Sequence, residues 1–196
     1  LRGLLYERDS MTPIPMTDQE AKIATDALSE QIDRYAELLV RKGCAVQKGQ
    51  SLVVSAPIQI ADFARRIERA AYAAGAGFVT VLWSDAESTR IKYENVSVER
   101  LSKTPSWVKE QLNSLAEEGA AFLFLEAHDP NILKGIDPAK PAAESRARNI
   151  DCDVFRSGLD FGRNAWCIAG VPVAPWAKEV FPNLSEAEAV YRLWVA

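Results

Sequence analysis

Two apolar segments joined by an amphipathic one constrain the fold of this chain most. Residues 51–56 (SLVVSA) and 77–83 (GFVTVLW) are short and almost wholly apolar, which is typical of strands covered on both faces of a sheet. Between them, apolar side chains recur at helical spacing from Ile60 to Ala74. A strand, a helix and a second strand within about thirty residues predict a right-handed crossover, which requires parallel strands.

Two later segments have the same character as the first two. Residues 120–127 (AAFLFLEA) and 165–171 (AWCIAGV) are apolar runs of strand length, and helical patterns separate all four runs. We therefore predict an α/β fold, a three-layer sandwich in which a mainly parallel sheet of about four strands is flanked by helices.

Capping signals predict where several of these helices begin. The segment Thr17-Asp-Gln-Glu20 is a capping box, and the helix that it opens could run to Lys42. Gly43 is expected to end that helix in the left-handed conformation. The segments Ser84-Asp-Ala-Glu87 and Ser185-Glu-Ala-Glu188 are two further capping boxes, each at an expected helix start.

Ligands of parallel sheets usually bind beyond the carboxyl ends of the strands. The candidate site residues at these ends are Trp83, Ser84, Asp85, His128, Asp129 and Trp176. Asp85 could hold a substrate amine, but the capping box favours a structural role. Ser84 is a weak candidate nucleophile because the only histidine must come from another strand end.

The other two candidate positions also have a structural interpretation. His128 and Asp129 could bind a metal ion or a substrate, but a loop histidine before an aspartate N-cap is the favoured reading. Trp176, together with Phe181, could dock a partner domain or fold back on its own sheet, and the sequence favours neither.

Several classes of function are excluded or disfavoured. The net charge of −4 and pI of about 5.2 argue against a nucleic-acid or anionic-membrane surface. No glycine-rich phosphate loop follows the first strand, and no apolar run is long enough to span a membrane. With one histidine and no HExxH motif, the chain is expected to hold no metal centre and no cofactor of its own.

The cysteines, the absence of a signal-peptide pattern and the first residues indicate the redox state, the cellular location and the start of the domain. An odd count of three cysteines without a CxxC motif predicts buried thiols rather than disulfides, and Cys167 in the last strand is expected to be buried and inert. With no signal-peptide pattern, we expect a cytoplasmic protein. Because the chain starts at Leu1 rather than methionine, residues 1–16 are interpreted as a leader or added segment before a domain at 17–196.

Residues 165–194 resemble part of the N-terminal domain of the aminopeptidase T and aminopeptidase S family. The matching residues are Trp166, Cys167, Ile168, Pro172, Trp176, Ala177, Lys178, Phe181, Pro182, Glu188, Ala189, Leu193 and Trp194. The resemblance extends back through residues 77–87 to residues 35–55. It thus covers most of the chain.

The resemblance implies a part of a bacterial, two-domain, metal-dependent aminopeptidase. In that family two divalent metals, zinc or cobalt, are held by a C-terminal domain that these residues do not include. The family forms homodimers in which the N-terminal domains help to enclose the cavity that receives peptide substrates. The chain is therefore expected to be a non-catalytic domain, inactive alone, whose partner is its own C-terminal domain.

Two other interpretations remain open at the level of sequence. The chain could be a free-standing α/β binding or interaction domain. It could also be a small-molecule α/β enzyme that acts through its strand-end loops, in which case a ligand at Asp85 or His128 would be expected.

Overall fold

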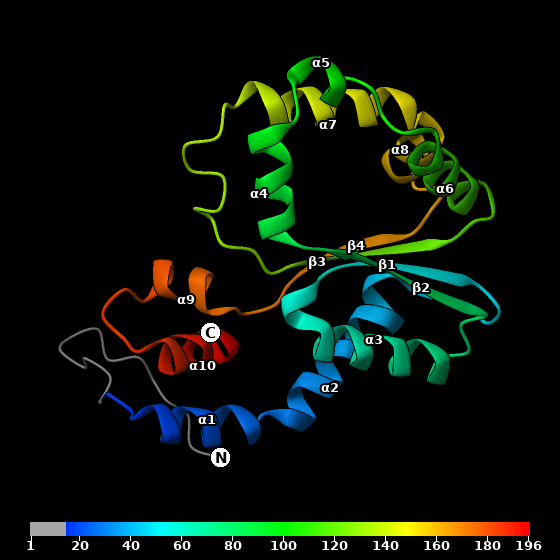
Figure 1. Ribbon diagram of the computed structural model, residues 1–196. Coiled ribbons are helices and arrows are strands. Elements are labelled where there is room, and N and C mark those ends of the chain that lie inside the picture. The colour runs from blue at the N-terminus through cyan, green and yellow to red at the C-terminus, as the bar shows by residue number, and fades with distance from the viewer. Residues whose placement is uncertain (1–14) are drawn as a thin grey trace.

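A single parallel sheet forms the centre of the computed structural model, which describes residues 15–196 (Figure 1). Its strands are β1 (Ser51–Pro57), β2 (Phe78–Ser84), β3 (Ala121–Glu126) and β4 (Trp166–Gly170). The strand order is β2-β1-β3-β4, and every neighbouring pair is parallel. The predicted α/β fold with four parallel strands is thus confirmed, and each strand boundary lies within one residue of its expected position.

One face of the sheet is covered by α2 (Ser29–Leu38), the π-helical turn η1 (Leu39–Gly43) and α3 (Ala61–Ala73). The predicted apolar stripe of α3 is buried, with Ala64, Ile67 and Ala71 fully inaccessible to solvent. These side chains pack in one cluster with Leu52 and Val54 of β1. The largest core of the molecule therefore lies between α3, α2 and the sheet.

The opposite face carries the second core. Here α6 (Ser106–Glu117) and α8 (Asp153–Asp160) contribute Leu112 and Phe155, which pack with Val53 and Phe122 of the sheet. The helices α4 (Ala86–Asn95), α5 (Val98–Leu101) and α7 (Ala139–Asp151) complete this layer (Figure 1). The three-layer arrangement expected from the alternating pattern is present.

A third group of helices lies beyond the carboxyl ends of the strands. It consists of α1 (Asp18–Asp26), α9 (Ala174–Val180) and α10 (Glu186–Val195), and α10 packs against both of the others (Figure 1). A short 3-10 turn, η2 (Ile58–Ile60), connects β1 to α3. This group and the helices α2 and α3 contribute the walls of two cavities at the carboxyl ends of the strands.

The N-terminal helix begins as predicted but is not continuous. The Thr17 hydroxyl accepts a hydrogen bond from the Glu20 amide at 3.3 Å, and the Glu20 carboxylate accepts one from the Thr17 amide at 2.8 Å. However, α1 ends at Asp26 and α2 begins at Ser29, so the expected helix to Lys42 is wrong. The break lets α1 pack on α10 while α2 packs on α3.

Gly43 is required for a reason other than the one expected. It lies inside the π-helical turn, and the left-handed residue that follows is Ala45, with a φ of 46°. A Cβ atom on Gly43 would lie 2.8 Å from the Cys167 sulfur. The glycine therefore permits close packing of η1 on β4, and the prediction of a left-handed cap at Gly43 was wrong.

The helix after β2 begins one residue later than predicted. Ser84 is the last residue of the strand, and Asp85 is the N-cap of α4. The Asp85 carboxylate accepts hydrogen bonds from the amide and the hydroxyl of Ser88, at 3.2 and 2.8 Å. Glu87 is therefore not the capping partner.

The residues 1–16 that the sequence analysis interpreted as a leader lie almost entirely outside the described residues. Within residues 15–196, no helix has the length and apolar character needed to cross a lipid bilayer.

Candidate functional site

The candidates after β2 lie at an edge of the sheet, away from the other candidates. β2 is an edge strand, and β1 separates it from β3. Trp83 is 46% exposed, and the hydrogen bonds from Ser88 hold the pKa of the Asp85 carboxyl below its usual range. The structure therefore does not bring Asp85 together with His128, and Asp85 stabilises the start of α4.

The candidates after β3 include a histidine–carboxylate pair. His128 Nδ1 lies 2.9 Å from an oxygen of Glu126, the last residue of β3, and both side chains are about half exposed. Asp129 instead accepts a hydrogen bond from the Asn131 amide at 2.8 Å, so it closes a local turn. Glu126 was missed in the sequence, although its position two residues before His128 places both side chains on one side of an extended segment.

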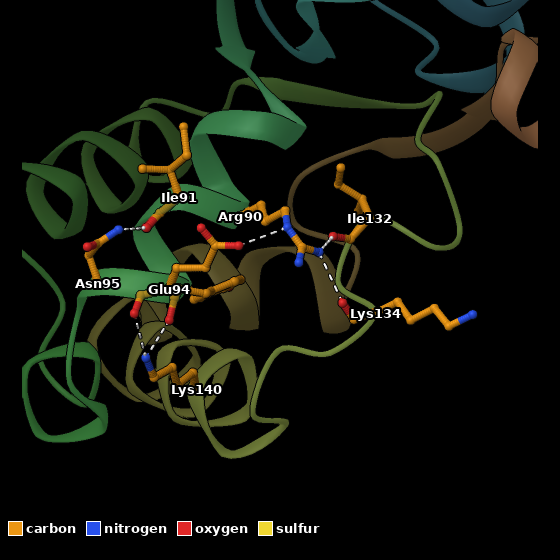
Figure 2. Close-up of polar contacts among 8 residues, drawn as sticks. Arg90, Ile91, Glu94, Asn95, Ile132, Lys134 and Lys140 are labelled. Atoms are coloured by element: carbon orange, nitrogen blue, oxygen red, sulfur yellow. Dashed lines mark hydrogen bonds and ion pairs between the residues drawn. The ribbon is translucent and has the colours of Figure 1, made fainter.

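The loop that carries His128 is held from α4 (Figure 2). Arg90 of α4 donates hydrogen bonds to the carbonyl oxygens of Ile132 and Lys134, at 2.6 and 3.1 Å, and pairs with Glu94 at 3.0 Å. Lys140 donates to the carbonyl oxygens of Tyr93 and Glu94, which joins the start of α7 to the end of α4. The guanidinium of Arg90 thus fixes the loop by its backbone.

The same loop is held from the other side by α9. The Asn131 side-chain amide donates to a carboxylate oxygen of Glu179 at 2.6 Å. The segment after β3 therefore bridges α4 and α9.

The candidate after β4, Trp176, lines a cavity of about 330 Å³. Its ring packs on Gly170, where an added Cβ would approach the indole to 2.9 Å. The Tyr35 hydroxyl donates to the Gly170 carbonyl at 3.3 Å, and Trp194 forms another wall. We call this space the aromatic cavity; its remaining lining residues are Leu28, Gln31, Ile32, Pro172 and Leu193.

A second cavity of about 410 Å³ lies beside the first, and Ile32, Pro172 and Trp194 line both. We call it the polar cavity, because Asp26, Asp62 and Arg66 are among its walls. In the sequence, Trp194 and the segment that contains Tyr35 contributed only to the family resemblance, and neither residue was a site candidate. Nothing in the spacing of these residues, from α2 and α10, could show that they share a wall.

The three thiols are free, and their environments differ. Burial raises the pKa of the Cys44 thiol to about 12, and burial is also the main reason why the pKa of the Cys152 thiol is raised. Cys167 is half-buried rather than buried, which corrects the expectation for this residue. The high pKa values disfavour the thiolate form at Cys44 and Cys152, so neither is suited to nucleophilic chemistry.

A family comparison identifies the class of protein. Residues 28–196 match the model of the thermophilic metalloprotease (M29) family, which is most of the chain. The chain belongs to the M29 family.

Individual M29 relatives agree with this assignment. The chain is 38% identical over 169 residues to aminopeptidase AmpS of Bacillus subtilis (strain 168), and the match covers 86% of this chain and 41% of the relative. It is 36% identical to aminopeptidase T of Thermus thermophilus, covering 87% of this chain and 42% of the relative. The M29 relatives are thus aminopeptidases, and the chain spans about two fifths of their length.

A solved M29 structure has the same fold. Wild-type AmpT from Thermus thermophilus superposes with a TM-score of 0.78 at 33% sequence identity, over 86% of this chain and 42% of that one. The predicted resemblance to aminopeptidase T and aminopeptidase S is therefore confirmed.

The M29 description implies a metal ion in the family. Among residues 15–196, no group of three or more His, Cys, Asp or Glu side chains lies close enough to hold a metal ion. The His128–Glu126 pair offers two ligands, and Asp129 is occupied by its own turn. A catalytic zinc usually takes three protein ligands, so these residues do not fit a peptidase metal centre.

Proposed function

We propose that this chain is the non-catalytic, N-terminal α/β domain of a metal-dependent aminopeptidase that releases N-terminal residues from peptides. In this proposal the metal ligands belong to a C-terminal domain, and the helices beyond the carboxyl ends of the sheet help to enclose the cavity that receives the peptide. No residue of the domain is assigned a catalytic role.

One observation carries the proposal. Matches that cover 84–87% of this chain cover only 40–42% of five aminopeptidases. The matched region forms one sheet with its own two cores, which is the organisation expected of a domain that folds as a unit.

The proposal has finer parts that follow from the family resemblance. They are two divalent metals, zinc or cobalt, in the C-terminal domain, a cytoplasmic location and a homodimer of the whole enzyme. Peptide substrates are the natural partner of a protein whose relatives are named aminopeptidases.

The experiment compares two proteins in the hydrolysis of leucine p-nitroanilide with added zinc or cobalt. The first is this chain alone, which should release no p-nitroaniline. The second is a chimera in which this chain replaces the matched segment of Bacillus subtilis AmpS, and it should show metal-dependent hydrolysis. Metal-stimulated hydrolysis by the purified chain alone would overturn the proposal.

A free-standing binding domain is the second candidate function. The two adjoining cavities favour it, because each has the volume of a small-molecule site and is lined by residues of this chain alone. This candidate predicts that the chimera folds but is inactive. It also predicts that the isolated chain binds ligands without the C-terminal domain.

A further inference from the structure

We propose that the aromatic cavity and the polar cavity together form one peptide-binding site, which takes an apolar side chain next to a positively charged one. The apolar side chain occupies the aromatic cavity, and the cationic group lies near Asp26 in the polar cavity. The inference rests on the proposed function in one respect, which is that the bound peptide is a substrate of an aminopeptidase.

The position of the cavities in the fold supports a ligand site. The chain proceeds from β1 to β2 on one side and places β3 on the other side, so the strand order reverses between β1 and β3. Ligands of open α/β sheets bind beyond the carboxyl ends of the strands at such a reversal. The polar cavity is lined by Ile60, which follows β1, and by Val171 and Pro172, which follow β4 on the far side of β3.

The aromatic cavity has the size and the walls for an apolar side chain. Its volume of about 330 Å³ lies at the lower end of the range of about 300–1,000 Å³ found for small-molecule pockets. The ring of Tyr35 lies 6.4 Å from that of Trp194, edge to face, and both rings pack with Phe63. These contacts hold the walls in place before a ligand arrives, which reduces the entropy lost on binding.

The charges around the polar cavity favour a cation. Arg66 is paired with Asp33 at 2.5 Å, and Asp62 is paired with Arg65 at 2.8 Å. Among residues 15–196, no ion pair involves Asp26, which is the last residue of α1. A carboxylate at a helix C-terminus is disfavoured by the helix dipole, so a ligand cation beside Asp26 removes an unfavourable interaction.

Trp194 makes the two cavities a single site. It lines both cavities together with Ile32 and Pro172, so two adjacent side chains of one peptide can lie on either side of the same wall. The net charge of −4 for the chain adds a weak general attraction for a cationic peptide.

The test measures binding of three blocked dipeptides to the whole 196-residue chain by calorimetry, without metal ions. The probes are acetyl-Phe-Lys-amide, acetyl-Phe-Glu-amide and acetyl-Ala-Lys-amide, whose blocked ends carry no charge. Acetyl-Phe-Lys-amide should bind at least about fivefold more tightly than either of the others. Equal binding of the three peptides, or no binding of any, would overturn the proposal.

Two variants with matched controls test the two halves of the site. Asp26→Asn should weaken binding of acetyl-Phe-Lys-amide by about three- to fivefold, while Asp18→Asn in the same helix leaves it unchanged. Trp176→Ala should weaken it by about tenfold, while Trp107→Ala on the exposed face of α6 has no effect. Weakening by the controls as well as by the site variants would contradict the assignment.

The readout separates this inference from the proposed function. Peptide binding by the chain does not require hydrolysis, so an inactive chimera with intact peptide binding would contradict only the proposed function. An active chimera whose isolated α/β domain does not distinguish the three peptides would contradict only the peptide site.

Discussion

The carboxylate of Glu188 accepts a hydrogen bond at 2.9 Å from the backbone amide of Met16, which lies 172 positions earlier in the chain. Glu188 is 1% exposed and also pairs with Arg192 at 3.1 Å. The sequence predicted that this carboxylate would cap its own helix, and only the first half of that capping box is present, from the Glu188 amide to the Ser185 hydroxyl at 3.2 Å. The carboxylate instead joins α10 to the segment that precedes α1.

Replacing this buried carboxylate should destabilise the domain. Glu188→Gln removes a negatively charged partner of Arg192. It also buries a side-chain NH2 group where the neighbouring Met16 amide and Arg192 guanidinium are themselves donors. The free energy of unfolding should therefore fall by about 1–3 kcal/mol. Urea denaturation measures the change. Glu186→Gln, in the same helix but exposed, is the control and should change stability by less than about 0.5 kcal/mol. Equal effects of the two substitutions would contradict the role given to Glu188.

The close approach of Trp176 to Gly170 predicts a coupled pair of substitutions. A Cβ atom on residue 170 would lie 2.9 Å from the indole, so Gly170→Ala should force the ring to move and cost about 1–3 kcal/mol of stability. In a Trp176→Ala background the same change should cost much less, because the colliding ring is absent. The measurement is a double-mutant cycle by urea denaturation, and additive effects would show that the ring already avoids residue 170.

The Lys92–Glu144–Tyr93 cluster predicts a pH dependence of stability. Glu144 accepts hydrogen bonds from Lys92 at 2.7 Å and from Tyr93 at 2.6 Å. Burial raises the pKa of the Glu144 carboxyl, but the hydrogen bonds from Lys92 and Tyr93 and the nearby charges of Lys92 and Arg148 outweigh it, so the pKa lies below its ordinary value of 4.5. Because the folded pKa is lower than the unfolded one, this carboxylate stabilises the fold above about pH 4.5.

That contribution should be lost as the pH falls through the lowered pKa of the folded state. The free energy of unfolding of the unmodified chain should therefore decrease more steeply between about pH 5 and pH 3 than that of Glu144→Gln. Urea denaturation at several pH values measures the difference. Glu110→Gln, an exposed substitution on α6, should leave the pH profile unchanged, and parallel profiles for the unmodified chain and Glu144→Gln would rule out the proposed contribution.

Removing the Arg90 guanidinium should release the loop after β3. Arg90→Met keeps an apolar stem but loses the hydrogen bonds to the Ile132 and Lys134 carbonyls. Trypsin should then cleave after Lys134 about tenfold faster than in the unmodified chain, because losing about 1.4 kcal/mol raises the open population about tenfold. Arg34→Met, at an exposed ion pair on α2, is the control. An unchanged cleavage rate in Arg90→Met would show that other contacts hold the loop.

The candidate site was predicted only in part, and the reason is spatial. Trp176 was selected because it follows the last strand, and it does line a cavity. Tyr35 and Trp194 line the same cavity from helices near the two ends of the chain, and a sequence carries no direct signal for contacts across 159 positions (Tyr35 to Trp194). Asp85 and His128 were selected on the same basis as Trp176, but neither lines this cavity. Asp85 follows the edge strand β2, and β1 separates that strand from β3, which His128 follows.

The sequence by itself determined the strands and their parallel direction, because periodic apolar patterns are local features that packing here did not override, and its matching residues indicated the family. Tertiary structure alone decided the break between α1 and α2, the role of Gly43 against Cys167, and the distant partner of Glu188. Each of these depends on which surfaces meet when α10 packs beside α1 and η1 packs beside β4. These contacts join segments that are far apart in the sequence, and local patterns do not encode them.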